Sequence, residues 1–86
     1  MFVIITYDVD KKRCSKAINL LRCYCFHVQD SVFMGELTEK QYQTINIELN
    51  KIVNAEKDRI LMVRVESIKA LKMNSIGPQS MIETIV

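Results

Sequence analysis

The sequence has no apolar run that approaches the roughly 20 residues that a membrane-spanning helix requires. Its opening apolar run is too short for a signal peptide and lacks the basic residues and the small-residue cleavage site of one. Internal repeats, low-complexity segments and domain linkers are also missing, so we expect residues 1–86 to form a single domain. These absences predict a cytoplasmic protein with no membrane partner.

Cysteine is scarce, and its spacing is not that of a metal site. The three cysteines, Cys14, Cys23 and Cys25, contain no CxxC pair, and an odd number cannot all be paired. The run Cys23-x-Cys25-x-His27 offers too few ligands, at the wrong spacing, for a structural zinc ion. We interpret the cysteines as free, buried thiols of a protein in a reducing compartment.

The composition is that of a small folded domain. Hydrophobic residues make up 49% of the chain and charged residues 26%, which excludes disorder. A chain of 86 residues can form one two-layer core that is marginally stable alone, so association would help it.

The net charge of +2 conceals two basic regions. Residues 57–72 are rich in lysine and arginine, and residues 11–29 contain no acidic residue but five basic ones, Lys11, Lys12, Arg13, Lys16 and Arg22. Clustering of this kind is typical either of a solvated helix face or of a surface that binds an anionic partner.

The first ten residues form an apolar, mostly β-branched run that ends at Tyr7, Asp8 and Asp10. A run without polar alternation predicts a central strand that is covered on both faces. We expect Asp8 to project at the rim of the sheet, where a carboxylate is solvated. A helix with apolar spacing follows over residues 11–25, and Asp8 or Asp10 can cap it, Asp10 being better placed.

The rest of the chain completes a known order of elements. Residues 26–37 predict one bent strand, or two strands joined at Asp30, with Ser31 as a turn hydroxyl. Thr38 and Gln41 form a capping box that begins a second helix, and residues 59–65 form another strand. This order predicts an α+β protein with the ferredoxin-like βαββαβ fold, one sheet with both helices on one face.

Two features predict a homodimer. The first is a further apolar segment, Met81–Val86, which follows the turn at Gly77-Pro78. Residues 67–73, before this turn, are either a short helix or a connection. We expect residues 79–86 to pair with a sheet edge of a second copy. The second feature is the sheet face opposite the helices, which needs a cover that the identical sheet of a second copy would provide.

Three segments together resemble one known family. They are the opening apolar strand, which ends in Thr6-Tyr7-Asp8-Val9, then Val28-Gln29-Asp30-Ser31-Val32-Phe33-Met34-Gly35-Glu36-Leu37, and the strand after the second helix together with a short tail, Ile85-Val86. In order and length the resemblance covers nearly the whole chain. They are similar to the small CRISPR-associated adaptation proteins, the second core subunit, which partners the CRISPR integrase in spacer acquisition.

The resemblance implies a ferredoxin-like homodimer that bridges integrase dimers and supports duplex DNA. It also implies a Mg²⁺-dependent endonuclease that acts on single-stranded RNA or duplex DNA. The matching catalytic and metal-binding residue is Asp8, one from each chain near the two-fold axis. Two facing carboxylates can hold one Mg²⁺, because this ion prefers oxygen ligands and keeps several of its waters.

The resemblance assigns further residues to the site. Tyr7 and Phe33 match packing positions beside the metal residue, and Ser31 matches a possible hydrogen-bond donor to phosphate. His27 stands where arginine is common and can donate to phosphate, although a lone histidine is more often a satisfied structural residue. The candidate nucleic-acid-binding residues are Lys12, Arg13, Lys16, Arg22 and His27.

A second, non-catalytic function stays open. The basic helix and residues 57–72 can hold a DNA backbone through phosphate contacts, which need no particular sequence and suit a scaffold that accepts any foreign DNA. A plain oligomerisation module is also compatible with the fold.

Overall fold

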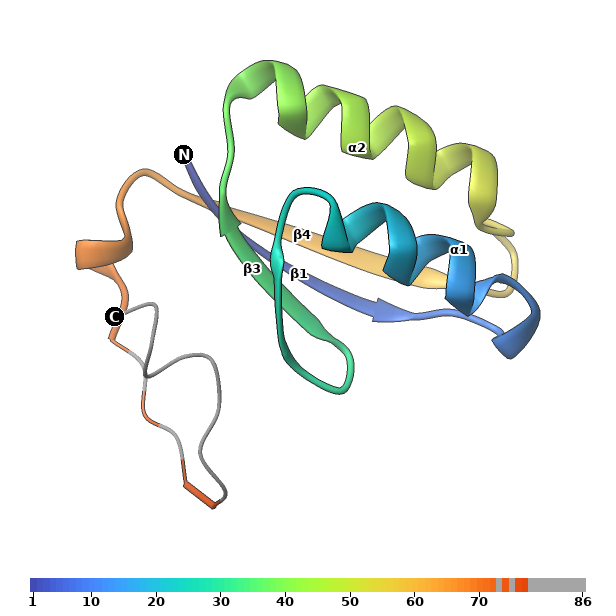
Figure 1. The fold of residues 1–86 in the computed structure, drawn as a ribbon, viewed down its shortest axis with the longest axis horizontal. Helices are drawn as coiled ribbons and strands as arrows, with labels where there is room; N and C mark the ends of the chain where they lie inside the picture. Colours follow the sequence, from blue (N-terminus) through green and yellow to red (C-terminus); the bar gives the residue numbers. More distant parts are fainter. Residues whose placement is uncertain (73, 75, 78–86) are drawn as a thin grey trace.

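The computed structural model describes residues 1–72, 74 and 76–77 (Figure 1). The four strands form one antiparallel sheet in the order β2-β3-β1-β4. Both helices lie on one side of this sheet. The elements along the chain are β1 (Phe2–Asp8), α1 (Lys11–Arg22), β2 (Phe26–Gln29), β3 (Val32–Glu36), α2 (Glu39–Ile52), β4 (Arg59–Val65) and the 3₁₀ helix η1 (Ile68–Ala70).

The predicted ferredoxin-like order of elements is confirmed. Residues 26–37 form two strands with a register shift between His27 and Gln29, and the ambiguous segment after β4 contains a short 3₁₀ helix. The predicted strand over residues 79–86 lies outside the described residues. No helix in the described part of the chain has the length and apolar character needed to cross a membrane.

Strand β1 lies in the centre of the sheet and is apolar on both faces. Val3, Ile5 and Tyr7 belong to the main core, beneath the helices. Because successive side chains of a strand alternate, Phe2 and Ile4 lie on the other face, in a second cluster with residues of β2 and β3. We call this face, which neither α1 nor α2 covers, the open face. Its apolar character explains why the β1 sequence shows no polar alternation.

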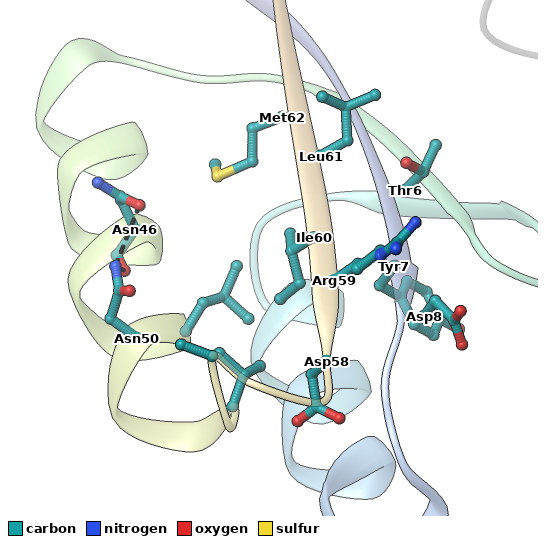
Figure 2. A pocket seen from close by; sticks show the side chains of 13 residues that line it. Thr6, Tyr7, Asp8, Asn46, Asn50, Asp58, Arg59, Ile60, Leu61 and Met62 are labelled. Carbon is teal, nitrogen blue, oxygen red and sulfur yellow. Dashed lines mark hydrogen bonds between the residues drawn. The ribbon is translucent and has the colours of Figure 1, made fainter.

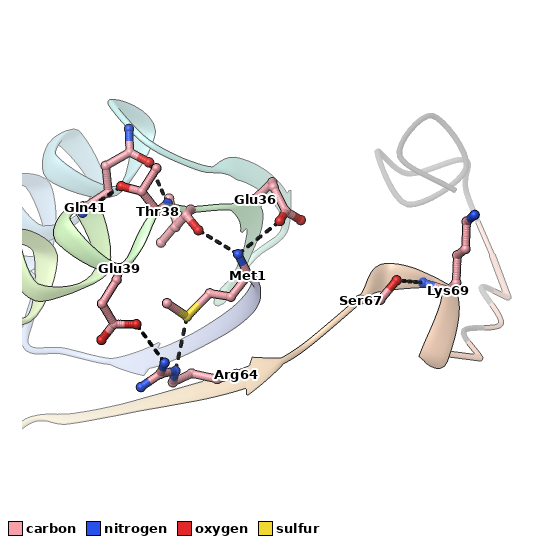
Figure 3. Close-up of polar contacts among 9 residues, drawn as sticks. Met1, Glu36, Thr38, Glu39, Gln41, Arg64, Ser67 and Lys69 are labelled. Atoms are coloured by element: carbon pink, nitrogen blue, oxygen red, sulfur yellow. Dashed lines mark hydrogen bonds and ion pairs between the residues drawn. The ribbon is translucent and has the colours of Figure 1, made fainter.

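Both helices begin where the sequence predicts. The Asp10 side chain caps α1 by accepting a hydrogen bond from the Lys12 backbone N–H at 3.0 Å. At the start of α2, Thr38 Oγ1 accepts from the Gln41 N–H at 3.1 Å, and Gln41 Oε1 accepts from the Thr38 N–H at 3.0 Å (Figure 3). These caps satisfy N–H groups that a helix cannot pair internally, so the predicted capping residues are confirmed.

The connection from α1 to β2 passes close over strand β3. A Cβ added at Gly35 would lie 3.2 Å from both Cys25 Cα and the Tyr24 carbonyl oxygen, which leaves room only for glycine without a shift of backbone. Cys25 is buried, as predicted, and burial raises the pKa of its thiol to about 11. Cys14 is partly buried. The prediction is wrong for Cys23, which ends α1 and is exposed, its Sγ donating to the Asn19 carbonyl at 3.3 Å.

A buried carboxylate, Asp58, ties the loop before β4 to the start of α1. It accepts hydrogen bonds from Arg13 Nε and Nη2 at 2.6 and 2.9 Å, from the Asp10 N–H at 3.0 Å and from the Asn54 N–H at 2.8 Å. Its side chain is 1% exposed. Burying a carboxylate costs its hydration, and here four hydrogen-bond donors compensate for that loss. We call this arrangement the Asp58 clamp.

The clamp also changes how Asp58 titrates. The hydrogen bonds from Arg13, followed by those from the Asn54 and Asp10 backbone, hold the pKa of the Asp58 carboxyl well below its ordinary value, against the opposing effect of burial. A carboxylate with a depressed pKa stabilises the fold at every pH above its pKa in the unfolded chain. That contribution is lost as the pH falls towards the pKa of the folded state.

We therefore expect the free energy of unfolding of the parent protein to fall as the pH drops below about 4, the pKa of an aspartate in an unfolded chain. Asp58→Asn should be less stable near neutral pH and should show a flatter dependence on acid, since it has no carboxylate to protonate. Urea unfolding followed by circular dichroism, from neutral pH down to about pH 3, measures both. Asp30→Asn, which removes an exposed carboxylate from the β2–β3 turn, is the matched control. Equal acid slopes for the parent and Asp58→Asn would contradict the assignment.

Candidate active site

Asp8 is the last residue of β1, and its side chain is exposed on the open face. In the pairing of β1 with β4 it lies directly opposite Arg59, and Thr6 lies opposite Leu61 in the next pair on the same face. Figure 2 shows the Asp8 carboxylate at the end of the sheet and the Arg59 side chain extending from β4 towards β1. The strand thus delivers Asp8 to the solvated rim that the sequence predicts.

Tyr7 anchors this end of β1 from the opposite face. Its hydroxyl donates to the Asp30 carbonyl at 2.6 Å, and its backbone N–H donates to the Ser31 carbonyl at 3.1 Å. Burial raises the pKa of the Tyr7 hydroxyl, and nearby Cys14 and Asp30 add to the effect, so the hydroxyl is a protonated donor at neutral pH. Tyr7 therefore fixes the β2–β3 turn beside the last residues of β1.

The aromatic residues beside Tyr7 are packing groups. Phe33 is fully buried, with its ring centroid 5.9 Å from that of Tyr7, and His27 stacks on Phe33 at 4.4 Å. The Nε2 atom of His27 lies 3.0 Å from the Asp30 carbonyl oxygen, so His27 donates to a backbone group when Nε2 carries the proton. These contacts favour the structural interpretation of His27. Ser31 is exposed in the turn, next to the end of β1.

The basic residues of α1 lie on the other side of the sheet from Asp8. Lys12, Lys16 and Arg22 are exposed, and α1 covers the face opposite the open face. Arg13, also predicted to bind nucleic acid, donates from Nε and Nη2 to the Asp58 carboxylate, so we leave it out of the proposed binding surface. The structure thus separates a basic helix surface from the Asp8 site.

A groove of about 670 Å³ follows the outer side of β4 (Figure 2). Asn46 and Asn50 of α2 line it on the helix side, while Asp8 and Arg59 lie at its open-face end. Arg59 is the site residue that sequence reasoning missed. Its position beside Asp8 follows from the register of β1 and β4 and not from a local pattern in the sequence.

The carboxylate oxygens of Asp8 suit magnesium better than a metal ion that needs three or more protein ligands. Among the described residues, no group of three or more His, Cys, Asp or Glu side chains is placed to hold a metal ion. Mg²⁺ commonly binds through one or two carboxylates and keeps several waters, so an exposed Asp8 fits it.

Comparison with known proteins identifies the family. The family model described as CRISPR associated protein Cas2 matches residues 1–73. The CRISPR-associated endoribonuclease Cas2 of Thermotoga maritima is 31% identical over 90% of this chain and 88% of its own length. The protein of the same description from Methanothermobacter thermautotrophicus is 34% identical over 90% of this chain and 85% of its own length.

Solved structures agree with the sequence relatives. A crystal structure described as cas2 superposes with a TM-score of 0.84 and 35% identity, covering 91% of this chain and 87% of that one. Streptococcus pyogenes Cas2 superposes with a TM-score of 0.80 and 26% identity, covering 90% of this chain and 100% of that one. The sequence relatives and the solved structures agree, and the chain belongs to the Cas2 family of CRISPR-associated proteins.

Proposed function

We propose that this protein is a magnesium-dependent endoribonuclease of CRISPR adaptation and that Asp8 is its metal-binding and catalytic residue. One observation carries the proposal: Asp8 presents an exposed carboxylate at the rim of the open face, in a chain whose relatives are named CRISPR-associated endoribonucleases. When bound, Mg²⁺ would supply an activated water and positive charge against the phosphate.

The chain's own residues hold Asp8 in place from both sides. On one side, Tyr7 is bound to the β2–β3 turn through its hydroxyl and its N–H. On the other side, the N–H of Asp10 is bound to Asp58. A site fixed by such neighbours orients a reacting group without further ordering cost. In this proposal Ser31, at the adjacent turn, donates a hydrogen bond to the phosphate.

We also propose that the active form is a homodimer that meets through the open face. Leu61, Phe26 and Val63 on this face are 60%, 53% and 38% exposed. They adjoin the buried cluster of Phe2, Val28 and Met34, and an apolar surface of this kind is typical of an interface. A second copy would bring the second Asp8 to the same face. Residues 79–86 are proposed to pair with a sheet edge of the partner.

A specific observation favours a second role, holding duplex DNA beside the CRISPR integrase. Helix α1 carries Lys12, Lys16 and Arg22 on exposed positions and has no acidic residue. Lysine and arginine contacts to phosphates do not depend on base sequence. Because this surface and Asp8 lie on different sides of the sheet, we propose that DNA binding and cleavage can be separated by mutation.

The first test is cleavage of labelled single-stranded RNA and of duplex DNA, with Mg²⁺ or with EDTA. We expect the parent protein to cut RNA only with Mg²⁺. Asp8→Asn should cut at least about 100-fold more slowly, because it loses the carboxylate that holds the ion while keeping the side-chain shape. Cutting that persists unchanged in Asp8→Asn would show that the activity does not belong to this site.

The second test addresses the basic helix. Lys12→Gln combined with Lys16→Gln should weaken binding of duplex DNA and lower the slope of log affinity against log salt by about 2, since each lost phosphate contact removes about 1. Fluorescence anisotropy over a salt series measures this slope. Lys40→Gln, an exposed lysine of α2, is the control for loss of charge. If the double variant binds DNA as tightly as this control, Lys12 and Lys16 are solvated surface residues that do not contact DNA.

A further inference from the structure

We propose that Arg59 binds a backbone phosphate of the RNA directly beside Asp8. The inference rests on the proposed function of the Asp8 site and adds a substrate-binding residue to it. Its basis is the pairing of two exposed, oppositely charged side chains on one face at the end of the sheet.

The register of the sheet places the two groups together. Asp8 and Arg59 are directly opposite in the antiparallel pairing of β1 with β4, and such pairs have Cβ atoms about 4.5–5.5 Å apart. Both side chains are exposed, and both line the same groove. An arginine side chain is long enough to reach past its partner, and Figure 2 shows Arg59 extended towards β1. A phosphate that approaches Asp8 therefore meets a guanidinium group on the neighbouring strand.

Two of the other three arginines have structural partners, and the third, Arg22, lies on α1. Arg13 is held by Asp58. Arg64 donates to Glu39 at 2.8 Å (Figure 3). It also lies over the Tyr42 ring, 4.8 Å from its centroid. Within the part of the chain that the structure describes, Arg59 takes part in no ion pair. Its charge is therefore available to a ligand.

The chemistry of arginine suits this position. A guanidinium group presents planar paired donors that match two oxygens of one phosphate, whereas lysine acts as a point charge. Asp8 alone would repel an RNA backbone before any cation binds. A positive group in the opposite position of the ladder offsets this repulsion and gives the phosphate a fixed place beside the carboxylate.

The test is binding of a labelled single-stranded RNA in EDTA, where neither metal nor cleavage contributes. We expect Arg59→Gln to weaken binding about 10-fold, the effect of losing one charge-assisted contact. The slope of log affinity against log salt should fall by about 0.7, the value for one phosphate of a single strand. Arg59→Lys should keep the slope and recover part of the affinity. Lys40→Gln should stay within about twofold of the parent under the same conditions.

Two further measurements separate this inference from its alternatives. Light scattering should give the same molar mass for Arg59→Gln and the parent; dissociation of the variant would show that Arg59 holds the dimer together, and would overturn the inference. Binding of Arg59→Gln equal to that of Lys40→Gln would also overturn it.

The outcome is independent of the cleavage assay. If Asp8→Asn cleaves RNA like the parent while Arg59→Gln binds RNA poorly in EDTA, the metal assignment fails and the phosphate site stands. If Asp8→Asn loses cleavage while Arg59→Gln binds and cleaves normally, the metal assignment stands and the phosphate site fails. In EDTA, Asp8→Asn should strengthen RNA binding, because it removes a negative charge beside the phosphate; weaker binding would count against the inference.

Discussion

The structure depends on one buried charge. Asp58 connects the loop after α2, in which it lies, to a part of the chain 45 to 48 residues earlier: the first turn of α1 and, through the Asp10 N–H, the segment that follows β1. Because an uncompensated carboxylate cannot stay buried, its donors must be brought together whenever the fold forms. The clamp thereby sets the position at which β1 ends and β4 begins, and Asp8 and Arg59 occupy those two positions.

The two faces of the sheet differ in structure and in their proposed roles. The helix-side face is a closed core in which Tyr7, Phe33 and His27 pack and hold the β2–β3 turn. The open face combines an apolar surface with a charged rim at Asp8 and Arg59. Strand alternation enforces this division, since Tyr7 and Asp8 are neighbours in sequence and cannot share a face. In the proposed function, the apolar surface meets a second copy and the charged rim beside it meets a phosphate.

Local signals in the sequence predicted the elements well. The caps at Asp10 and Thr38 depend on residues within one helical turn, and the breaks in apolar periodicity marked the strands. The Asp58 clamp depends instead on Arg13, which is 45 residues away, and no local pattern indicates that pairing. Charge counting treated Arg13 as available, whereas its charge is already neutralised inside the protein. The site was predictable at Asp8 from the resemblance, but Arg59 required knowledge of the strand register.

Strand β4 lies at the edge of the sheet and pairs on one side with β1 among the described residues. Its sequence places four consecutive apolar residues, Ile60 to Val63, between Arg59 and Arg64. An exposed edge with such a run is a template for uncontrolled strand addition, and flanking charges are the usual protection against it. Arg59 and Arg64 therefore disfavour edge-to-edge pairing of newly made chains before a partner covers this edge. The charges at the two ends of this run therefore bear on the solubility of the chain as well as on the candidate site.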